Sequence, residues 1–109
     1  MVYIDAMELV ETAVFTRQVE AELSDEAYSG LQWQLLLAPA RGDLIPGSGG
    51  LRKLRLALPG RGKRGGARVI YYWHRSAERL YLLFLYPKNV RSDLTRAQLK
   101  VLRGLVGDR

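Results

Sequence analysis

Residues 68–86 of the chain read RVIYYWHRSAERLYLLFLY, and this stretch decides the fold. Residues 68–74 are mostly β-branched or aromatic and predict a strand. Residues 75–79 turn the chain, and the apolar run at 80–86 predicts a second strand. Because that run is apolar on both of its faces, we expect it to lie inside a sheet that is covered on each side.

A third strand is predicted upstream, over residues 51–58, where apolar and polar side chains alternate. Its later leucines fall on one face, whereas Lys53 and Arg55 fall on the other. Loops rich in glycine and proline are predicted on either side of this strand, over 45–50 and 59–67.

Helices are predicted before and after these strands, because apolar residues recur there at steps of three and four. Thr12, Ser24 and Thr95 suit the N-cap positions, since a hydroxyl oxygen accepts from the free N–H groups of a first turn. The remaining elements are a loose lead-in over 1–6, a short strand over 7–12, and helices over 13–23, 24–38 and 95–106.

These elements predict a single domain over residues 1–109, of the α+β class. Two N-terminal helices pack on a three- to four-stranded antiparallel sheet, and a C-terminal helix follows. We expect all the helices to lie against one side of the sheet.

Charge is divided unevenly between the two halves of the chain, although the whole carries a net charge of +6. Residues 1–43 have a net charge of −6, and residues 44–109 have a net charge of +12. Such asymmetry indicates a polyanionic partner, most simply nucleic acid. The alternative is a solvated basic face that keeps the protein in solution.

The composition excludes several classes of site. The chain has no cysteine and a single histidine, His74, which excludes a disulfide scaffold, a thiolate metal site and a two-histidine acid–base pair. Because carboxylates are scarce in the basic half, we expect neither a metal nor another cofactor. No apolar run reaches the length of a membrane span, so we expect a cytoplasmic protein without a membrane partner.

The most unusual segment is the basic, glycine-rich loop 59–67, PGRGKRGGA. It lacks the glycine–lysine–serine/threonine ending of a nucleotide-binding loop. Cations and aromatic residues on neighbouring strands suit RNA instead, which needs phosphate neutralisation and base stacking. Cleavage of RNA by its own 2′-hydroxyl fits these residue types, because arginines stabilise the phosphorane and a lysine with a lowered pKa accepts a proton.

Three fragments of the chain carry a resemblance to a known family. They are GLRKLR at 50–55, GRGKRGGARVIYY at 60–72, and the YPKN corner at 86–89 followed by Asp93 and Leu94. Together, from about Leu9 to the last helix, the chain resembles the HigB-type branch of the RelE/ParE toxins of bacterial type II toxin–antitoxin systems.

The resemblance implies an mRNA interferase that cleaves mRNA in the decoding site of the ribosome without a metal. It implies that Arg68 contacts the scissile phosphate, and we expect its side chain to be mostly exposed. The other catalytic residues that it implies are Lys63, Arg64 and Lys88. The expected RNA-binding residues are Lys53, Arg55, Arg61, Asn89 and Arg91. Related toxins carry a tyrosine near the start of the last helix, where this chain has Thr95.

The resemblance also implies partners. We expect a cognate antitoxin with a helix-turn-helix DNA-binding domain, and contact with operator DNA only through the toxin–antitoxin complex. Two alternatives stay open: a gyrase-inhibiting toxin of the ParE type, and a basic nucleic-acid-binding module without catalysis.

Overall fold

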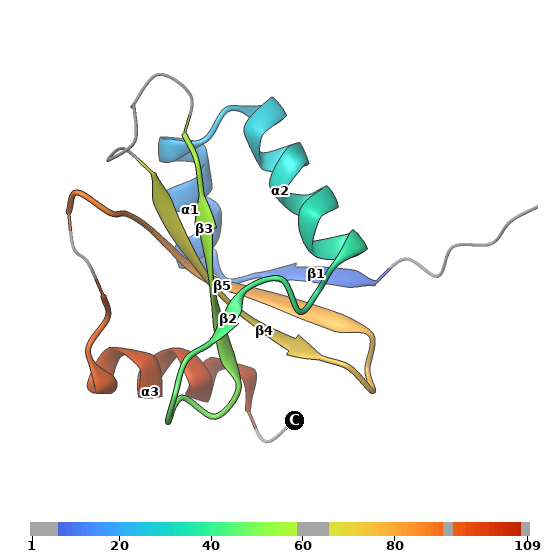
Figure 1. Cartoon of the computed structure of the whole chain (residues 1–109), viewed down its shortest axis with the longest axis vertical. Coiled ribbons are helices and arrows are strands. Elements are labelled where there is room, and N and C mark those ends of the chain that lie inside the picture. The colour runs from blue at the N-terminus through green and yellow to red at the C-terminus, as the bar shows by residue number, and fades with distance from the viewer. Residues whose placement is uncertain (1–6, 59–65, 91–92, 108–109) are drawn as a thin grey trace, which may run out of the picture.

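The computed structural model describes residues 7–58, 66–90 and 93–107, which form one sheet and three helices (Figure 1). The elements in chain order are β1 (Glu8–Glu11), α1 (Ala13–Glu22), α2 (Asp25–Leu37), β2 (Asp43–Leu44), β3 (Leu51–Leu56), β4 (Ala67–His74), β5 (Arg79–Pro87) and α3 (Arg96–Val106). The α+β class and the element order predicted from the sequence are confirmed.

The sheet has five strands in the order β1-β5-β4-β3-β2. Strands β2 to β5 pair in antiparallel fashion, whereas β1 runs parallel to β5. The sequence predicted three or four antiparallel strands, and the structure differs at the two edges. Strand β1 pairs with the outer edge of β5, and the backbone N–H groups of Glu8 and Thr12 donate to the carbonyls of Glu78 and Leu82. Strand β2 has only two residues, too few to show an alternating pattern.

The three predicted N-caps are confirmed. The hydroxyl oxygens of Thr12, Ser24 and Thr95 accept from backbone N–H groups three residues further on, at 3.0, 3.1 and 3.1 Å. At Thr95 the contact is reciprocal, because the Gln98 side chain accepts from the Thr95 N–H at 2.8 Å. This capping box fixes where α3 begins, directly after Asp93 and Leu94.

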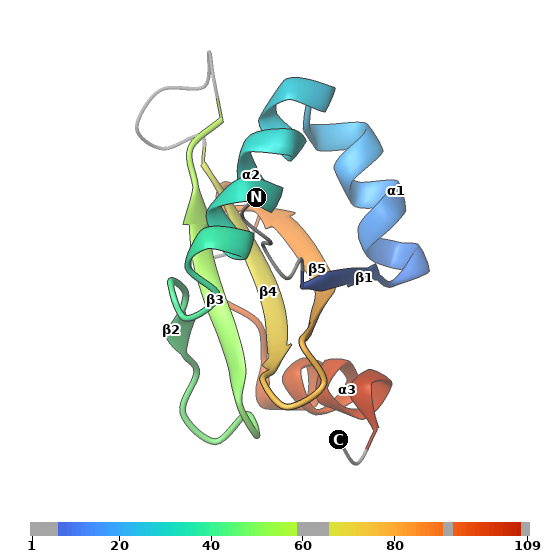
Figure 2. The same cartoon turned by 90° about the vertical axis from the view of Figure 1, so that its right-hand side faces the viewer.

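The helices cover both faces of the sheet, so the prediction that all of them lie on one side is wrong. Figures 1 and 2 show α1 and α2 together and α3 apart from them. One apolar cluster joins α1 and α2 to the sheet, and a second, which includes Leu102 and Val106, joins α3 to the opposite face. The reason lies in β5, whose leucines are buried on both faces and need cover on each.

A β-bulge in β5 sets which of its side chains face α3. Ile70 pairs with Phe84 and Tyr71 pairs with Leu82, so Leu83 is the extra residue. Leu83 therefore joins Phe84 and Tyr86 in the cluster beneath α3, whereas Leu82 and Leu85 belong to the cluster beneath α1 and α2.

Buried Tyr71 fixes the connection between α2 and β2. Its hydroxyl donates to the carbonyl of Pro39 at 2.7 Å and accepts from the N–H of Gly42 at 2.8 Å. Burial raises the pKa of Tyr71, which keeps the hydroxyl in its donating form. In the described part of the chain, no helix is both long and apolar enough to cross a membrane.

Candidate functional site

The register of β3, β4 and β5 brings three basic side chains onto one face of the sheet. Arg55 pairs with Arg68, and Arg68 pairs with Tyr86 on the other side of β4. In the next row, Lys53 pairs with Ile70. Directly opposed residues of antiparallel strands share a face, so Lys53, Arg55 and Arg68 lie on the face that α3 also covers. The structure thus brings three of the predicted site residues together on one face.

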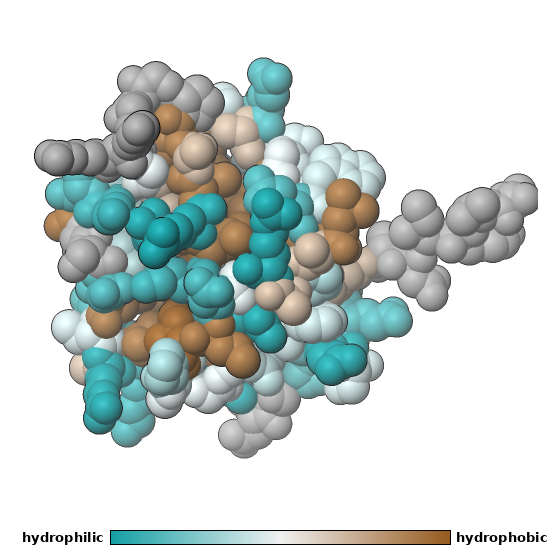
Figure 3. Space-filling model, in the orientation of Figure 1, coloured by the Kyte–Doolittle hydropathy of each residue, from teal (hydrophilic) through white to brown (hydrophobic). Residues whose placement is uncertain are grey.

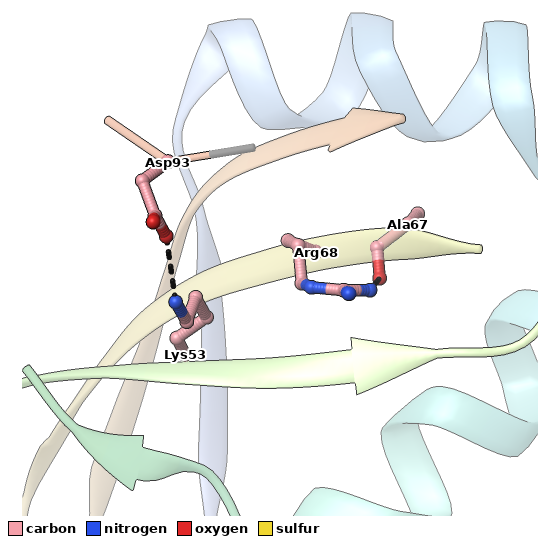
Figure 4. Close-up of polar contacts among 4 residues, drawn as sticks. All are labelled: Lys53, Ala67, Arg68 and Asp93. Carbon is pink, nitrogen blue, oxygen red and sulfur yellow. Dashed lines mark hydrogen bonds and ion pairs between the residues drawn. The ribbon is translucent and has the colours of Figure 1, made fainter. Parts of the chain in front are cut away.

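Arg68 lies at the centre of this arrangement and is buried, with only 8% of the residue exposed. The expectation of a mostly exposed side chain is therefore wrong. The cause is its position on an inner strand, with Arg55 on one side and Tyr86 on the other. The side chain folds back along β4, and its Nη1 donates to the carbonyl of Ala67 at 3.1 Å (Figure 4). A guanidinium has five N–H donors, and this bond uses one of them.

Lys53 is paired with an acid that sequence reasoning did not select as a site residue. Its Nζ lies 2.7 Å from Oδ1 of Asp93, which follows β5 (Figure 4). The hydrogen bond and the charge of Lys53 lower the pKa of Asp93, and the charge of Arg68 acts in the same direction. One feature of the sequence could have identified Asp93 as a partner for a basic residue. It is the one acid between Glu78 and Asp108, in the basic half of the chain.

A hollow of about 310 Å³ lies between the sheet and the start of α3. Its described lining consists of Ile45, Pro46, Lys53, Ile70, Tyr86, Asp93, Leu94 and Leu99. The floor is therefore mostly apolar, and the Lys53–Asp93 ion pair stands at its rim. Figure 3 shows this face of the molecule, where hydrophilic side chains border a strip of hydrophobic ones.

Tyr86 is the one aromatic residue in the described lining of the hollow, and it lies within the apolar cluster beneath α3. Tyr86 is 3% exposed, and its ring packs against Phe84 with 6.2 Å between the ring centroids. Tyr86 therefore forms part of the floor beside Arg68 rather than an open stacking surface for a base.

Lys88 and Asn89 are exposed at the end of β5. The backbone N–H of Lys88 donates to the carbonyl of Gly66 at 2.9 Å, which holds this corner beside the start of β4. Lys88 is thus anchored next to the strand that carries Arg68. The other predicted site residues, Arg61, Lys63, Arg64 and Arg91, lie outside the residues that the structure describes.

The described residues supply cations for an anionic ligand and no cluster of side chains that could bind a metal ion. Within residues 7–58, 66–90 and 93–107, no group of three or more His, Asp or Glu side chains could hold a metal. Lys53, Arg55 and Arg68 supply several N–H donors on one rigid surface, which suits the oxygens of a phosphate.

Comparison with known proteins adds two findings. A family model described as the RelE toxin of the RelE/RelB toxin–antitoxin system matches residues 7–108. A solved structure of the Escherichia coli toxin RelE, a double arginine-to-alanine mutant in the free state, superposes with a TM-score of 0.61. The two chains share 15% sequence identity, and the match covers 91% of this chain and 98% of the other. At this identity the superposition shows a common fold.

Proposed function

The chain belongs to the RelE toxin family of toxin–antitoxin systems, and from this premise we propose that it is a ribosome-dependent mRNA endoribonuclease that works without a metal. The observation that carries the proposal is the row of paired residues Arg55, Arg68 and Tyr86, with Lys53 in the next row. This pairing gathers several cations on one rigid sheet face, which supports the binding of RNA phosphates there.

The proposed reaction uses a nucleophile that belongs to the substrate. The 2′-hydroxyl loses its proton and attacks the adjacent phosphorus, and the bond to the 5′-oxygen of the next nucleotide breaks. The products are a 2′,3′-cyclic phosphate and a 5′-hydroxyl that has gained a proton. Negative charge grows on the phosphorane oxygens during this step, so a preorganised guanidinium lowers the barrier.

Arg68 is suited to that role because an inner strand holds its backbone and neighbours enclose its side chain. Lys88 adds positive charge at the adjacent corner of the sheet. On the sequence resemblance we propose Lys63 and Arg64 as further catalytic cations, and the HigB-type branch as the subtype. Lys53, Arg55, Arg61, Asn89 and Arg91 are the proposed RNA-binding residues.

The proposal includes the partners that such a toxin requires. We expect a cognate antitoxin, with a helix-turn-helix domain that brings the complex to its operator DNA. The toxin itself acts on mRNA at the decoding site of the ribosome, which places its action in the cytoplasm.

The test is cleavage of a defined mRNA on purified ribosomes, mapped by primer extension, for the wild type and three variants. Arg68→Ala should slow cleavage by about two to three orders of magnitude, the scale of losing one preorganised donor. Arg68→Lys should recover only part of the rate, because an ammonium cannot form two parallel hydrogen bonds. Arg17→Ala removes an exposed cation of α1 and should cleave like the wild type.

Because Arg68 is buried, thermal unfolding of each variant must show that the fold is kept. Wild-type cleavage should persist in excess EDTA on an RNA substrate that folds without magnesium. Rapid cleavage by a folded Arg68→Ala protein would contradict the assigned role. Undisturbed translation together with loss of gyrase supercoiling would replace the nuclease by a gyrase inhibitor.

A further inference from the structure

A second depression, of about 780 Å³, separates α3 from the turn that joins β2 to β3. Figure 1 shows this turn beside α3 at the lower end of the sheet. We call the depression the α3 groove; its described lining is Pro46, Gly47, Ser48, Gly49, Arg96, Leu99, Lys100, Arg103, Gly104 and Gly107. None of the described lining residues is acidic, and three are basic.

Arg103 fixes the width of the α3 groove. Its Nε donates to the carbonyl of Gly49 at 2.9 Å, and its Nη1 donates to the carbonyl of Gly107 at 2.7 Å. The guanidinium also lies over the ring of Tyr72, 4.6 Å from the centroid. A residue of α3 is thus tied to the opposite wall, and the groove is already formed before any ligand arrives.

Arg96 and Lys100 line the groove one helical turn apart, and both are exposed. Like charges at positions i and i+4 destabilise a helix. The α3 helix therefore has two repelling cations on the wall of a preformed groove. An anion between them relieves the repulsion and gains two charge-assisted contacts.

The α3 groove continues into the hollow of the candidate active site. Pro46 and Leu99 line both depressions, so their walls meet at these two residues. A chain of phosphates that passes Lys53 in the hollow can extend over this shared wall to Arg96 and Lys100. A single bound anion needs no such continuity, whereas a strand of RNA does.

We propose that the α3 groove is a second binding site for the phosphodiester backbone of RNA, separate from the residues that cleave it. This inference rests on the proposed function for its class of ligand. Arg96 and Lys100 bind phosphates away from the scissile bond, and Arg103 holds the groove open. The groove therefore sets affinity for RNA and leaves the rate of the bound complex unchanged.

The experiment compares the wild type with Arg96→Ala/Lys100→Ala and with the control Arg17→Ala/Arg41→Ala. The control removes the same charge from exposed positions that do not line the groove. Binding is measured by fluorescence anisotropy with a 2′-O-methyl oligoribonucleotide, which has no nucleophile and is not cut. A second arm measures binding to ribosomes without mRNA. Salt is varied in both arms, and single-turnover cleavage is measured at saturating protein.

The groove variant should bind roughly ten- to thirtyfold more weakly near 0.1 M salt, and its slope of log K against log salt should fall by about 1.4. The control should match the wild type, and the cleavage rate at saturation should be unchanged. Weaker binding in the oligonucleotide arm, the ribosome arm or both supports the groove and identifies its RNA as messenger, ribosomal or either.

Binding equal to that of the control in both arms overturns the inference. A wild type that cuts no RNA while the groove variant still binds more weakly refutes the nuclease and keeps the groove. A wild type that cuts mRNA while the groove variant binds normally refutes the groove and keeps the nuclease.

Discussion

Arg55 and Arg68 are direct cross-strand partners on β3 and β4, so two guanidinium groups project from one row of the sheet. Like charges in this position destabilise a sheet by about 0.2–1 kcal/mol. The same pairing concentrates positive charge where a phosphate is proposed to bind. The Arg55–Arg68 pairing is therefore expected to lower the stability of the fold and to raise its affinity for a phosphate.

Arg55→Ala should change stability and RNA affinity in opposite directions. The exposed side chain fills no core space, so its removal should raise the free energy of unfolding by about 0.2–1 kcal/mol through relief of the repulsion. Affinity for a non-cleavable RNA should fall at the same time. Urea unfolding and fluorescence anisotropy measure the two effects, and a drop in both stability and affinity would show that the arginine pair is not strained.

Asp93→Asn should release Lys53 for a phosphate. The carboxylate holds Lys53 at 2.7 Å, and an exposed ion pair of this kind is weak. RNA affinity should therefore rise about two- to fivefold at low salt. Glu20→Gln removes one negative charge from α1 and serves as the control for net charge. An equal rise in both variants would assign the effect to net charge alone.

The contribution of the Lys53–Asp93 ion pair to stability should depend on pH in one direction. Lys53 lowers the pKa of Asp93 below its ordinary value of 3.8, so the folded state favours the ionised carboxyl. The stabilisation is present above pH 3.8 and is lost as the pH falls through the lower pKa of the folded state. A carboxyl NMR titration should show the pKa of Asp93 rising in Lys53→Gln. An unchanged pKa in that variant would exclude the ion pair in solution.

Two substitutions test how Tyr71 fixes the α2–β2 connection. Tyr71→Phe leaves the buried Gly42 N–H without its acceptor and should lower the free energy of unfolding by about 1–3 kcal/mol. Gly42→Ala should also destabilise, because an added Cβ would lie 2.7 Å from Cε1 of Tyr71. Gly30→Ala is the matched control, since its added Cβ would meet no atom within 4 Å. Equal free energies of unfolding for all three variants would show that the α2–β2 connection rearranges without a loss of stability.

Local patterns were sufficient to predict much of the fold. The alternation in β3, the β-branched and aromatic run of β4 and the N-cap residues are signals that neighbouring residues create among themselves. The parallel pairing of β1 with β5 is not of that kind, because 71 positions separate Glu8 from its partner Arg79. The side on which α3 packs was also missed, although the apolar run of β5 correctly predicted cover on both faces of the sheet.

The candidate site was predictable only in its residue types. The alternation of residues 51–58 predicted that Lys53 and Arg55 share a strand face, and the register places that face beside Arg68. The burial of Arg68 depends on its cross-strand neighbours, Arg55 and Tyr86, which only the register reveals. Asp93 joins Lys53 across 40 positions of sequence, a distance over which no local pattern extends.

The placement of α3 opposite α1 and α2 also gives the molecule an electric dipole. The acids of β1, α1 and α2 are Glu8, Glu11, Glu20, Glu22, Asp25 and Glu26, whereas α3 carries Arg96, Lys100 and Arg103 and no acid. A polyanion exerts a torque on such a molecule and turns its α3 side inward before contact. More encounters then begin in one orientation at low ionic strength, whereas physiological salt screens this alignment at separations beyond the Debye length of about 8 Å.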